Sequence, residues 1–122
     1  MEFKEYREYP AFIQRVVDGD TVEANIDLGF GLKYKTKIRF YEYDAPETWR
    51  PSCNKERELG LRAKTYLINN IERKEVLLRT FKKGKYGRVL AEVYINDRDI
   101  IQEMKDLNLT KEWFLDNNNN NS

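Results

Sequence analysis

The first forty residues alternate between short strand-like segments and turns, and this pattern most restricts the possible folds. Phe12 to Val17 and Thr21 to Asp27 flank the turn-prone group Asp18-Gly19-Asp20. Lys33 to Tyr41 alternates charged side chains with apolar or aromatic ones, and the two glycines of Leu28 to Leu32 favour a turn before it. The pattern predicts three consecutive strands joined by tight turns.

One long amphipathic helix follows. We expect Asn54 to cap a helix that begins near Lys55 and ends near residue 70, because an apolar stripe recurs at helical spacing. The stripe consists of Leu59, Ala63, Tyr66 and Leu67. Two further strands are predicted at Val76 to Thr80 and Val89 to Ile95, and a short second helix at Ile100 to Lys105. Five strands closing around one long helix predict an α+β, mainly β fold, a small closed or nearly closed barrel.

The 122 residues fit one domain, which we expect over residues 1–115, with an Asn-rich disordered tail over 116–122. The chain contains no His and only one Cys, Cys53. These counts exclude catalytic triads with His, zinc sites with His and an internal disulfide. Any bound metal must therefore be held mostly by oxygens, which indicates Ca²⁺ or Mg²⁺, and any general base is expected to be a carboxylate.

Lysine and arginine are concentrated in the middle of the chain. Residues 50–90 carry 12 basic and 4 acidic side chains, although the net charge of the whole chain is only +1. Such a segment is either a solvated face or a surface for a polyanionic partner. No apolar run is long enough to span a bilayer, and the sequence as written begins with a polar segment. We therefore expect no membrane partner and a cytoplasmic protein, with a secreted mature form as the alternative.

Three short clusters gather carboxylates and guanidinium groups in turn-like contexts. They are Asp18 to Thr21, then Arg39 with Asp44 to Glu47, then Lys85 to Arg88. Each cluster alone has a structural explanation as a turn or a surface hairpin. Together they supply what phosphodiester hydrolysis needs, because carboxylates bind a hard cation or remove a proton from water, and arginines donate to phosphate oxygens.

These motifs resemble those of the staphylococcal nuclease (thermonuclease) family. The matching segments are Val16 to Val22, Ile38 to Glu47 and Lys85 to Ala91, in the family's order, and the similarity runs from about Phe12 to Leu109. The resemblance implies a five-stranded OB-fold-like barrel with two helices. It also implies a monomeric, Ca²⁺-dependent nuclease that cleaves DNA and RNA, preferably single strands, and leaves 3′-phosphate and 5′-hydroxyl ends.

The resemblance also implies roles for individual residues. The Ca²⁺ ligands would be Asp20, Asp44 and the main-chain carbonyl of Ala45. Arg39 and Arg88 would bind the phosphate and stabilise the transition state, Glu47 would be the general base, and Lys85 and Tyr86 would contact the substrate. Asp18 would be a neighbour of the metal site rather than a ligand.

The sequence also departs from the family's pattern. The segment from Val22 to Ile38 is longer than usual, from which we expect an enlarged loop beside the cleft. After Leu109 the match fades, and the family's terminal helix is expected to be missing. Trp113 and Phe114 lie near the positions of base-stacking aromatics in the family, but core packing is an equally good interpretation of Trp113.

Two other classes of function remain open at this point. A domain of this kind can be a non-catalytic module that binds nucleic acid or protein, because a fold alone does not fix a function. A plain single-strand binder is the third option. The joint presence of Asp20, Asp44, Glu47, Arg39 and Arg88 favours the nuclease, because carboxylates in a binding groove repel phosphate unless a cation lies between them.

Overall fold

A computed structural model describes residues 6–48, 52–81 and 88–118. The first described elements are three antiparallel strands, β1 (Arg7–Asp18), β2 (Thr21–Gly29) and β3 (Leu32–Phe40). The pairing of β1 with β2 shifts register after Ile13 and again after Val16. Such bulges bend a strand and increase its twist, which a small barrel requires. All three predicted strands are present at their expected positions.

Two later strands complete a closed barrel. β4 (Glu75–Thr80) pairs with β1, β5 (Val89–Ile95) pairs with β4, and β5 returns to pair in parallel with β3. The strand order is therefore β3-β2-β1-β4-β5, closed by β3 and β5, and the two-residue β6 (Arg98–Asp99) adds to the edge of β5. The five-stranded, mainly β, OB-fold-like barrel expected from the sequence is confirmed.

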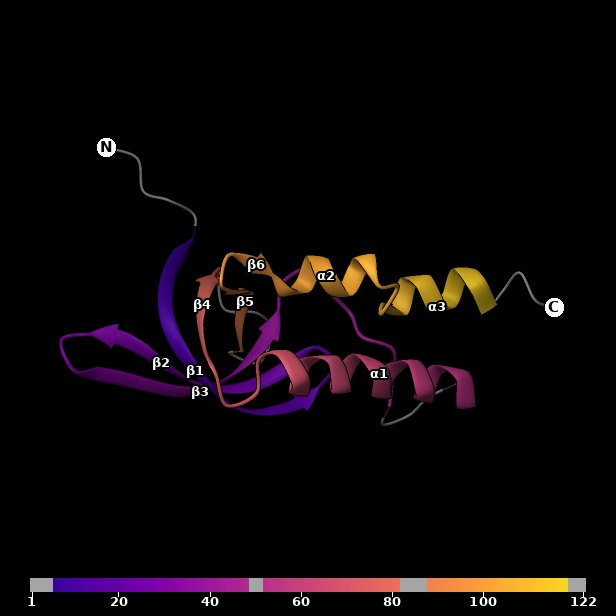
Figure 1. Cartoon of the computed structure of the whole chain (residues 1–122), viewed down its shortest axis with the longest axis horizontal. Helices are drawn as coiled ribbons and strands as arrows, with labels where there is room; N and C mark the ends of the chain where they lie inside the picture. Colours follow the sequence, from indigo (N-terminus) through magenta and orange to yellow (C-terminus); the bar gives the residue numbers. More distant parts are fainter. Residues whose placement is uncertain (1–5, 49–51, 82–87, 119–122) are drawn as a thin grey trace.

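The barrel interior is filled by the alternate residues of each strand. Because successive strand side chains point to opposite faces, every second residue is buried where a strand covers the barrel interior, as along all of residues 89–95. The fully buried side chains of the strands include Ile13, Val22, Ile38, Phe40, Leu78 and Val93. Helix α1 (Asn54–Asn70) adds Ala63 and Leu67 from its predicted stripe, and α2 (Ile100–Asp106) adds Ile100 and Met104. The two helices lie against the same barrel and complete one core (Figure 1).

The structure differs from the sequence-based expectations at the helix ends. Cys53, not Asn54, is the N-cap of α1, and no side chain caps that end; instead the Ser52 backbone N–H donates to the Glu56 carboxylate at 2.7 Å. A third helix, α3 (Lys111–Asn118), follows Leu109, so the expectation of a missing terminal helix was wrong. It extends through residues 116–118 of the segment expected to be a tail, and residues 119–122 lie outside the described part. Among the described residues, none of the helices combines the length and apolar composition that a bilayer crossing requires.

One buried ion pair joins α1 to α3. The Glu56 side chain is fully buried, and its carboxylate accepts a hydrogen bond from the ammonium group of Lys111. Burial opposes the charged form of Glu56, but the bonds from Lys111 and from the Ser52 backbone outweigh it and lower the pKa of Glu56. This pair helps to attach the C-terminal helix, since Phe114 is the one buried side chain among residues 111–117.

Loss of Lys111 is expected to destabilise the fold. Lys111→Met leaves a buried carboxylate without its cation and should lower the free energy of unfolding by about 2–3 kcal/mol. This loss is smaller than for a fully buried ion pair because the Lys111 side chain is partly exposed. Adding Glu56→Gln should restore part of that loss. Urea titrations followed by circular dichroism measure both effects; equal stability of Lys111→Met and wild type would contradict them.

The same pair predicts a pH dependence. Because folding lowers the pKa of Glu56, its contribution to stability is present above the ordinary pKa of glutamate and is lost as the pH falls through the lowered folded value. Glu56→Gln removes this titration, so its stability should fall less steeply with acid than that of wild type. Thermal unfolding between pH 7 and pH 2 measures the difference between the two curves.

Candidate active site

The turn between β1 and β2 lies against helix α1 and the loop after β3. A Cβ atom added at Gly19 would lie 2.8 Å from the Cβ of Ala45 and 2.9 Å from the Cβ of Ala63. Real Cβ atoms do not approach so closely, so only glycine allows this packing. The contact fixes the position of Asp20, the next residue in the chain.

Asp20 is almost fully buried and has three polar partners. Its carboxylate accepts hydrogen bonds from the Thr21 hydroxyl at 3.0 Å and from the Ala45 backbone N–H at 3.1 Å, and it lies 3.2 Å from a guanidinium nitrogen of Arg39. Burial nevertheless raises the pKa of Asp20, because desolvation exceeds the favourable effects of Arg39 and the hydrogen bonds. An additional positive charge beside this carboxylate would therefore stabilise its ionised form.

Arg39 lies between two carboxylates. It stands opposite Thr21 in the β2–β3 pairing, which places its side chain beside Asp20. Its second terminal nitrogen donates to the Asp44 carboxylate and, at 3.4 Å, to the Tyr43 carbonyl. The Arg39 side chain is 24% exposed, whereas that of Asp44 is 77% exposed. The Arg39 guanidinium is thus bound by buried Asp20 through one terminal nitrogen and by exposed Asp44 through the other.

The loop that carries Asp44 is held by the C-terminal segment. The hydroxyl of Tyr43 donates to the Leu109 carbonyl, and the Lys111 backbone N–H donates to the Asp44 carbonyl at 2.9 Å. Burial is the main reason why the pKa of Tyr43 is raised far above its ordinary value, so this hydroxyl stays protonated and remains a donor. Lys111 therefore holds the loop with its backbone and α1 with its side chain.

Helix α1 supports the next part of the same loop through Gly60. A Cβ atom there would lie 2.5 Å from the methyl group of Thr48 and 2.6 Å from the Pro46 carbonyl oxygen. Sequence reasoning missed Gly60, Tyr43 and Lys111 as supports of the site. An isolated glycine inside an otherwise good helical pattern was the available signal for Gly60, because it usually has a packing reason.

These contacts gather the predicted residues around one small hollow of about 140 Å³. Its lining includes Asp18, Asp20, Arg39, Ala45, Glu47 and Arg88. Asp44 joins the group through its bond to Arg39. Glu47 is exposed, and Arg88, immediately before β5, is half-buried. Lys85 and Tyr86 lie outside the described residues.

The donors around the hollow are oxygens of the kind that Ca²⁺ binds. Asp20 and Asp44 supply carboxylates, and Ala45 supplies a main-chain carbonyl in the same loop, so the chemistry of the set fits a hard cation. In the described parts of the chain, no three or more Asp, Glu, Cys or His side chains are arranged to hold a metal ion. Arg39 instead contacts both carboxylates.

A larger hollow of about 790 Å³ adjoins the site and includes Trp113. Its lining combines Arg39 and Asp44 with residues of α3. Trp113 is 37% exposed, whereas Phe114 is buried. Of the two aromatic residues, Phe114 therefore belongs to the core and Trp113 faces the hollow, so core packing was the wrong interpretation of Trp113.

Comparisons with known proteins agree with this arrangement. The family model described as staphylococcal nuclease homologue matches residues 37–116. Protein ParB of Escherichia coli is 31% identical over 69% of this chain and 41% of its own length. Endonuclease YhcR of Bacillus subtilis is 36% identical over 70% of this chain and 7% of its own, and an uncharacterized endonuclease of Escherichia coli is 29% identical over 70% and 48%.

The chain thus spans less than half the length of each of these relatives. The family model, in contrast, covers well over half of the 122 residues, including β5, all of α1 and the loop with Asp44 and Glu47. The chain belongs to the staphylococcal nuclease homologue family.

Proposed function

We propose that this chain is a nuclease that hydrolyses phosphodiester bonds of DNA and RNA, with single strands preferred, to leave 3′-phosphate and 5′-hydroxyl ends. The observation that carries the proposal is the 140 Å³ hollow, where Arg39 of β3 and Arg88, which immediately precedes β5, meet the carboxylates of two turns. Membership of the family supports it, as do the names of two relatives called endonucleases.

Arg39 and Arg88 would bind the scissile phosphate. Both line the hollow, and each guanidinium can donate two parallel hydrogen bonds to phosphate oxygens. Negative charge increases on these oxygens as water adds to phosphorus, so fixed donors bind the transition state more strongly than the substrate. The ion pairs of Arg39 with Asp20 and Asp44 hold its side chain in place before substrate arrives.

Glu47 would act as the general base. It lines the hollow from the loop that α1 supports at Thr48, so its backbone position is fixed while its side chain reaches solvent. The carboxylate takes a proton from a water molecule, the water oxygen bonds to phosphorus, and the bond from phosphorus to the 5′ oxygen breaks. The 5′ oxygen takes up a proton from solvent and leaves as a hydroxyl, and Glu47 then returns its proton to solvent.

Asp20, Asp44 and the carbonyl of Ala45 would hold Ca²⁺. When bound, the cation would polarise the phosphate and lower the pKa of a nearby water. The burial of Asp20, which raises its pKa, supports a cation partner for that carboxylate. The chain is proposed to act without a second copy, and Lys85 and Tyr86 to contact the nucleotide.

Replacement of the proposed base tests the mechanism directly. Glu47→Gln keeps the shape of the side chain but removes its capacity to accept a proton, so kcat on single-stranded DNA should fall about 10²–10⁴-fold. Glu58→Gln, an exposed carboxylate on α1, is the matched control and should cleave normally. Unchanged cleavage by Glu47→Gln with a native circular dichroism spectrum would exclude Glu47 as the base.

The forked geometry of Arg88 provides a second test. Arg88→Lys retains the charge but loses the paired donors, and kcat should fall about 10²–10³-fold with little change in thermal stability. Arg62→Lys on the exposed face of α1 serves as the control. A change in KM alone would mean that Arg88 binds substrate without stabilising the transition state.

Metal removal and end-group analysis test the cation and the bond that breaks. Cleavage of labelled single-stranded DNA should stop with EGTA and return with added Ca²⁺, and the products should carry 3′-phosphate and 5′-hydroxyl ends. Full activity in EGTA would reject the Ca²⁺ requirement. Phosphorylated 5′ ends would reject the proposed direction of cleavage, and binding without any cleavage would favour the non-catalytic alternative.

A further inference from the structure

Strands β2 and β3 continue beyond the barrel as a projecting arm, defined here as residues 27–37. Ile26 is the last buried residue of β2 and Ile38 the first of β3, and every residue between them is partly or fully exposed. In Figure 1 the arm extends away from all three helices. The expectation of an enlarged loop beside the cleft was wrong, because Thr21 and Arg39 mark the site end of this hairpin and its tip is the opposite end.

The tip of the arm presents a fully exposed phenylalanine. Phe30 is 101% exposed and has φ 56°, between Gly29 at φ 84° and Gly31 at φ 77°. A positive φ is uncommon for a bulky residue and costs free energy. Three further apolar side chains of the arm are also exposed, namely Leu28, Leu32 and Tyr34. They lie beyond the end of the barrel, so there is no core for them to pack against. This apolar end contributes nothing to the core, which indicates a contact with another molecule.

The other side of the arm is basic and is continuous with the active site. Residues 27–37 contain three lysines and one acidic residue, Asp27. Lys33, Lys35 and Lys37 alternate along β3, so they share the face of the strand on which Arg39 stands. From Leu32 to Arg39 the strand spans roughly 23 Å at about 3.3 Å per residue. The basic row therefore leads from the arm directly to the proposed phosphate-binding arginine.

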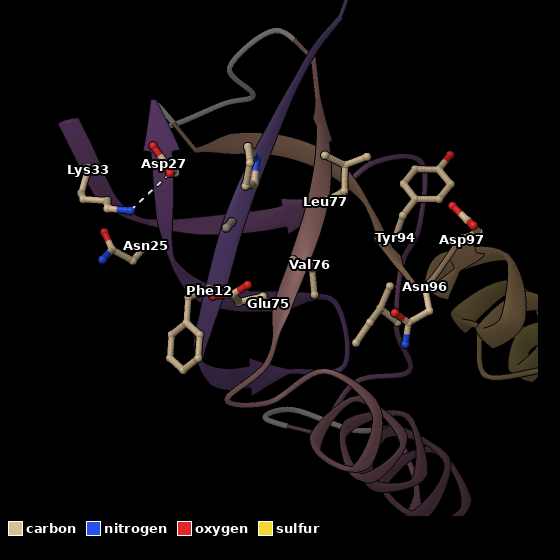
Figure 2. A pocket seen from close by; sticks show the side chains of 13 residues that line it. Phe12, Asn25, Asp27, Lys33, Glu75, Val76, Leu77, Tyr94, Asn96 and Asp97 are labelled. Atoms are coloured by element: carbon tan, nitrogen blue, oxygen red, sulfur yellow. Dashed lines mark ion pairs between the residues drawn. The ribbon is translucent and has the colours of Figure 1, made fainter. Parts of the chain in front are cut away.

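Part of this charge is already neutralised. Lys33 pairs with Asp27 at 3.4 Å, which Figure 2 shows, and Glu23 pairs with Arg15 at 2.9 Å. Among the ion pairs recorded for the described residues, none includes Lys35 or Lys37. The hydrogen bond from Arg15 is the main reason why the pKa of Glu23 is lowered, and the nearby charges of Lys37 and Lys35 add to the effect. Lys35 and Lys37 are thus the cations of the arm that remain for a partner.

The hollow beside the base of the arm does not suit a polyanion. It has a volume of about 450 Å³ and is lined by Asp27, Glu75 and Asp97, with Lys33 as its cation (Figure 2). An anionic strand would be repelled there and attracted to the lysines of β3. An exposed aromatic ring at the end of a basic row is a combination that can bind single-stranded nucleic acid, since bases stack on the ring and phosphates pair with lysines.

We propose that the arm is a second binding site for single-stranded nucleic acid, in which Phe30 stacks on a base and Lys35 and Lys37 bind phosphates of a strand that enters the active site at Arg39. One part of this inference, that the bound strand continues from the arm into the active site, rests on the proposed function. The binding itself is independent of cleavage. Long substrates reach both sites, and short ones reach only the active site.

The experiment compares binding and cleavage of 4- and 16-nucleotide DNA strands, the two ends of the usual site size of such a barrel. Fluorescence anisotropy in EGTA measures binding without cleavage. For the 16-mer, Phe30→Ala should weaken binding about tenfold, and Lys35→Gln/Lys37→Gln should reduce the slope of log K against log salt by about 1.4. Binding and kcat for the 4-mer should not change. Leu61→Ala and Lys55→Gln/Lys74→Gln, exposed residues outside the arm, are the matched controls.

The outcomes separate this inference from the proposed function. If the arm variants bind the 16-mer as wild type does, the arm proposal is overturned, whether or not the chain is a nuclease. If wild type never cleaves DNA but the variants lose 16-mer binding, the arm proposal holds and the nuclease proposal fails. Two other results would also overturn the proposal if the arm variants still bind the 16-mer normally. If the variants lose binding to phosphatidylserine vesicles, the arm binds a membrane; if they lose self-association in sedimentation, the arm binds a second copy of the chain.

Discussion

The parallel pairing of β3 with β5 is the constraint on which the site depends. These strands are separated in sequence by α1 and β4, yet they pair at Ile38 with Val89 and at Arg39 with Leu90. This pairing closes the barrel and removes two sheet edges. It also places Arg88, which immediately precedes β5, beside the hollow that Arg39 lines from β3. Closure of the fold and assembly of the two arginines are therefore the same event.

Helix α1 and the C-terminal segment then hold the remaining carboxylates in place. Gly19 and Gly60 allow the turn before Asp20 and the loop around Pro46 to pack against α1 at distances that no other residue permits. Lys111 links this loop to the buried carboxylate of Glu56. The site is thus built on irregular loops, but each loop is fixed by a close backbone contact or a buried polar bond, which is how loops acquire the precision that chemistry requires.

Local pattern was sufficient for most of the elements. Alternation along Lys33 to Tyr41 predicted β3, and the apolar stripe with Ala63 and Leu67 predicted α1, because both signals depend on neighbours within one strand or one helical turn. The same signals failed for α3 and for the N-cap of α1. Helix α3 has a weak apolar pattern and is attached by Phe114 and by the pairing of Lys111 with Glu56, 55 residues earlier in the chain. No periodicity within a short window contains that information.

The sequence by itself determined the chemistry that is available: with no histidine and one cysteine, the reactive groups are carboxylates, guanidinium groups and main-chain oxygens. It also determined which turns carry them, since Asp20, Asp44 and Glu47 lie in turn-forming motifs. Only the tertiary structure decided that Asp20 is buried against Arg39, that Trp113 faces a hollow while Phe114 enters the core, and that the long β2–β3 hairpin points away from the site. Burial and proximity depend on contacts between residues far apart in the sequence, which no local pattern contains.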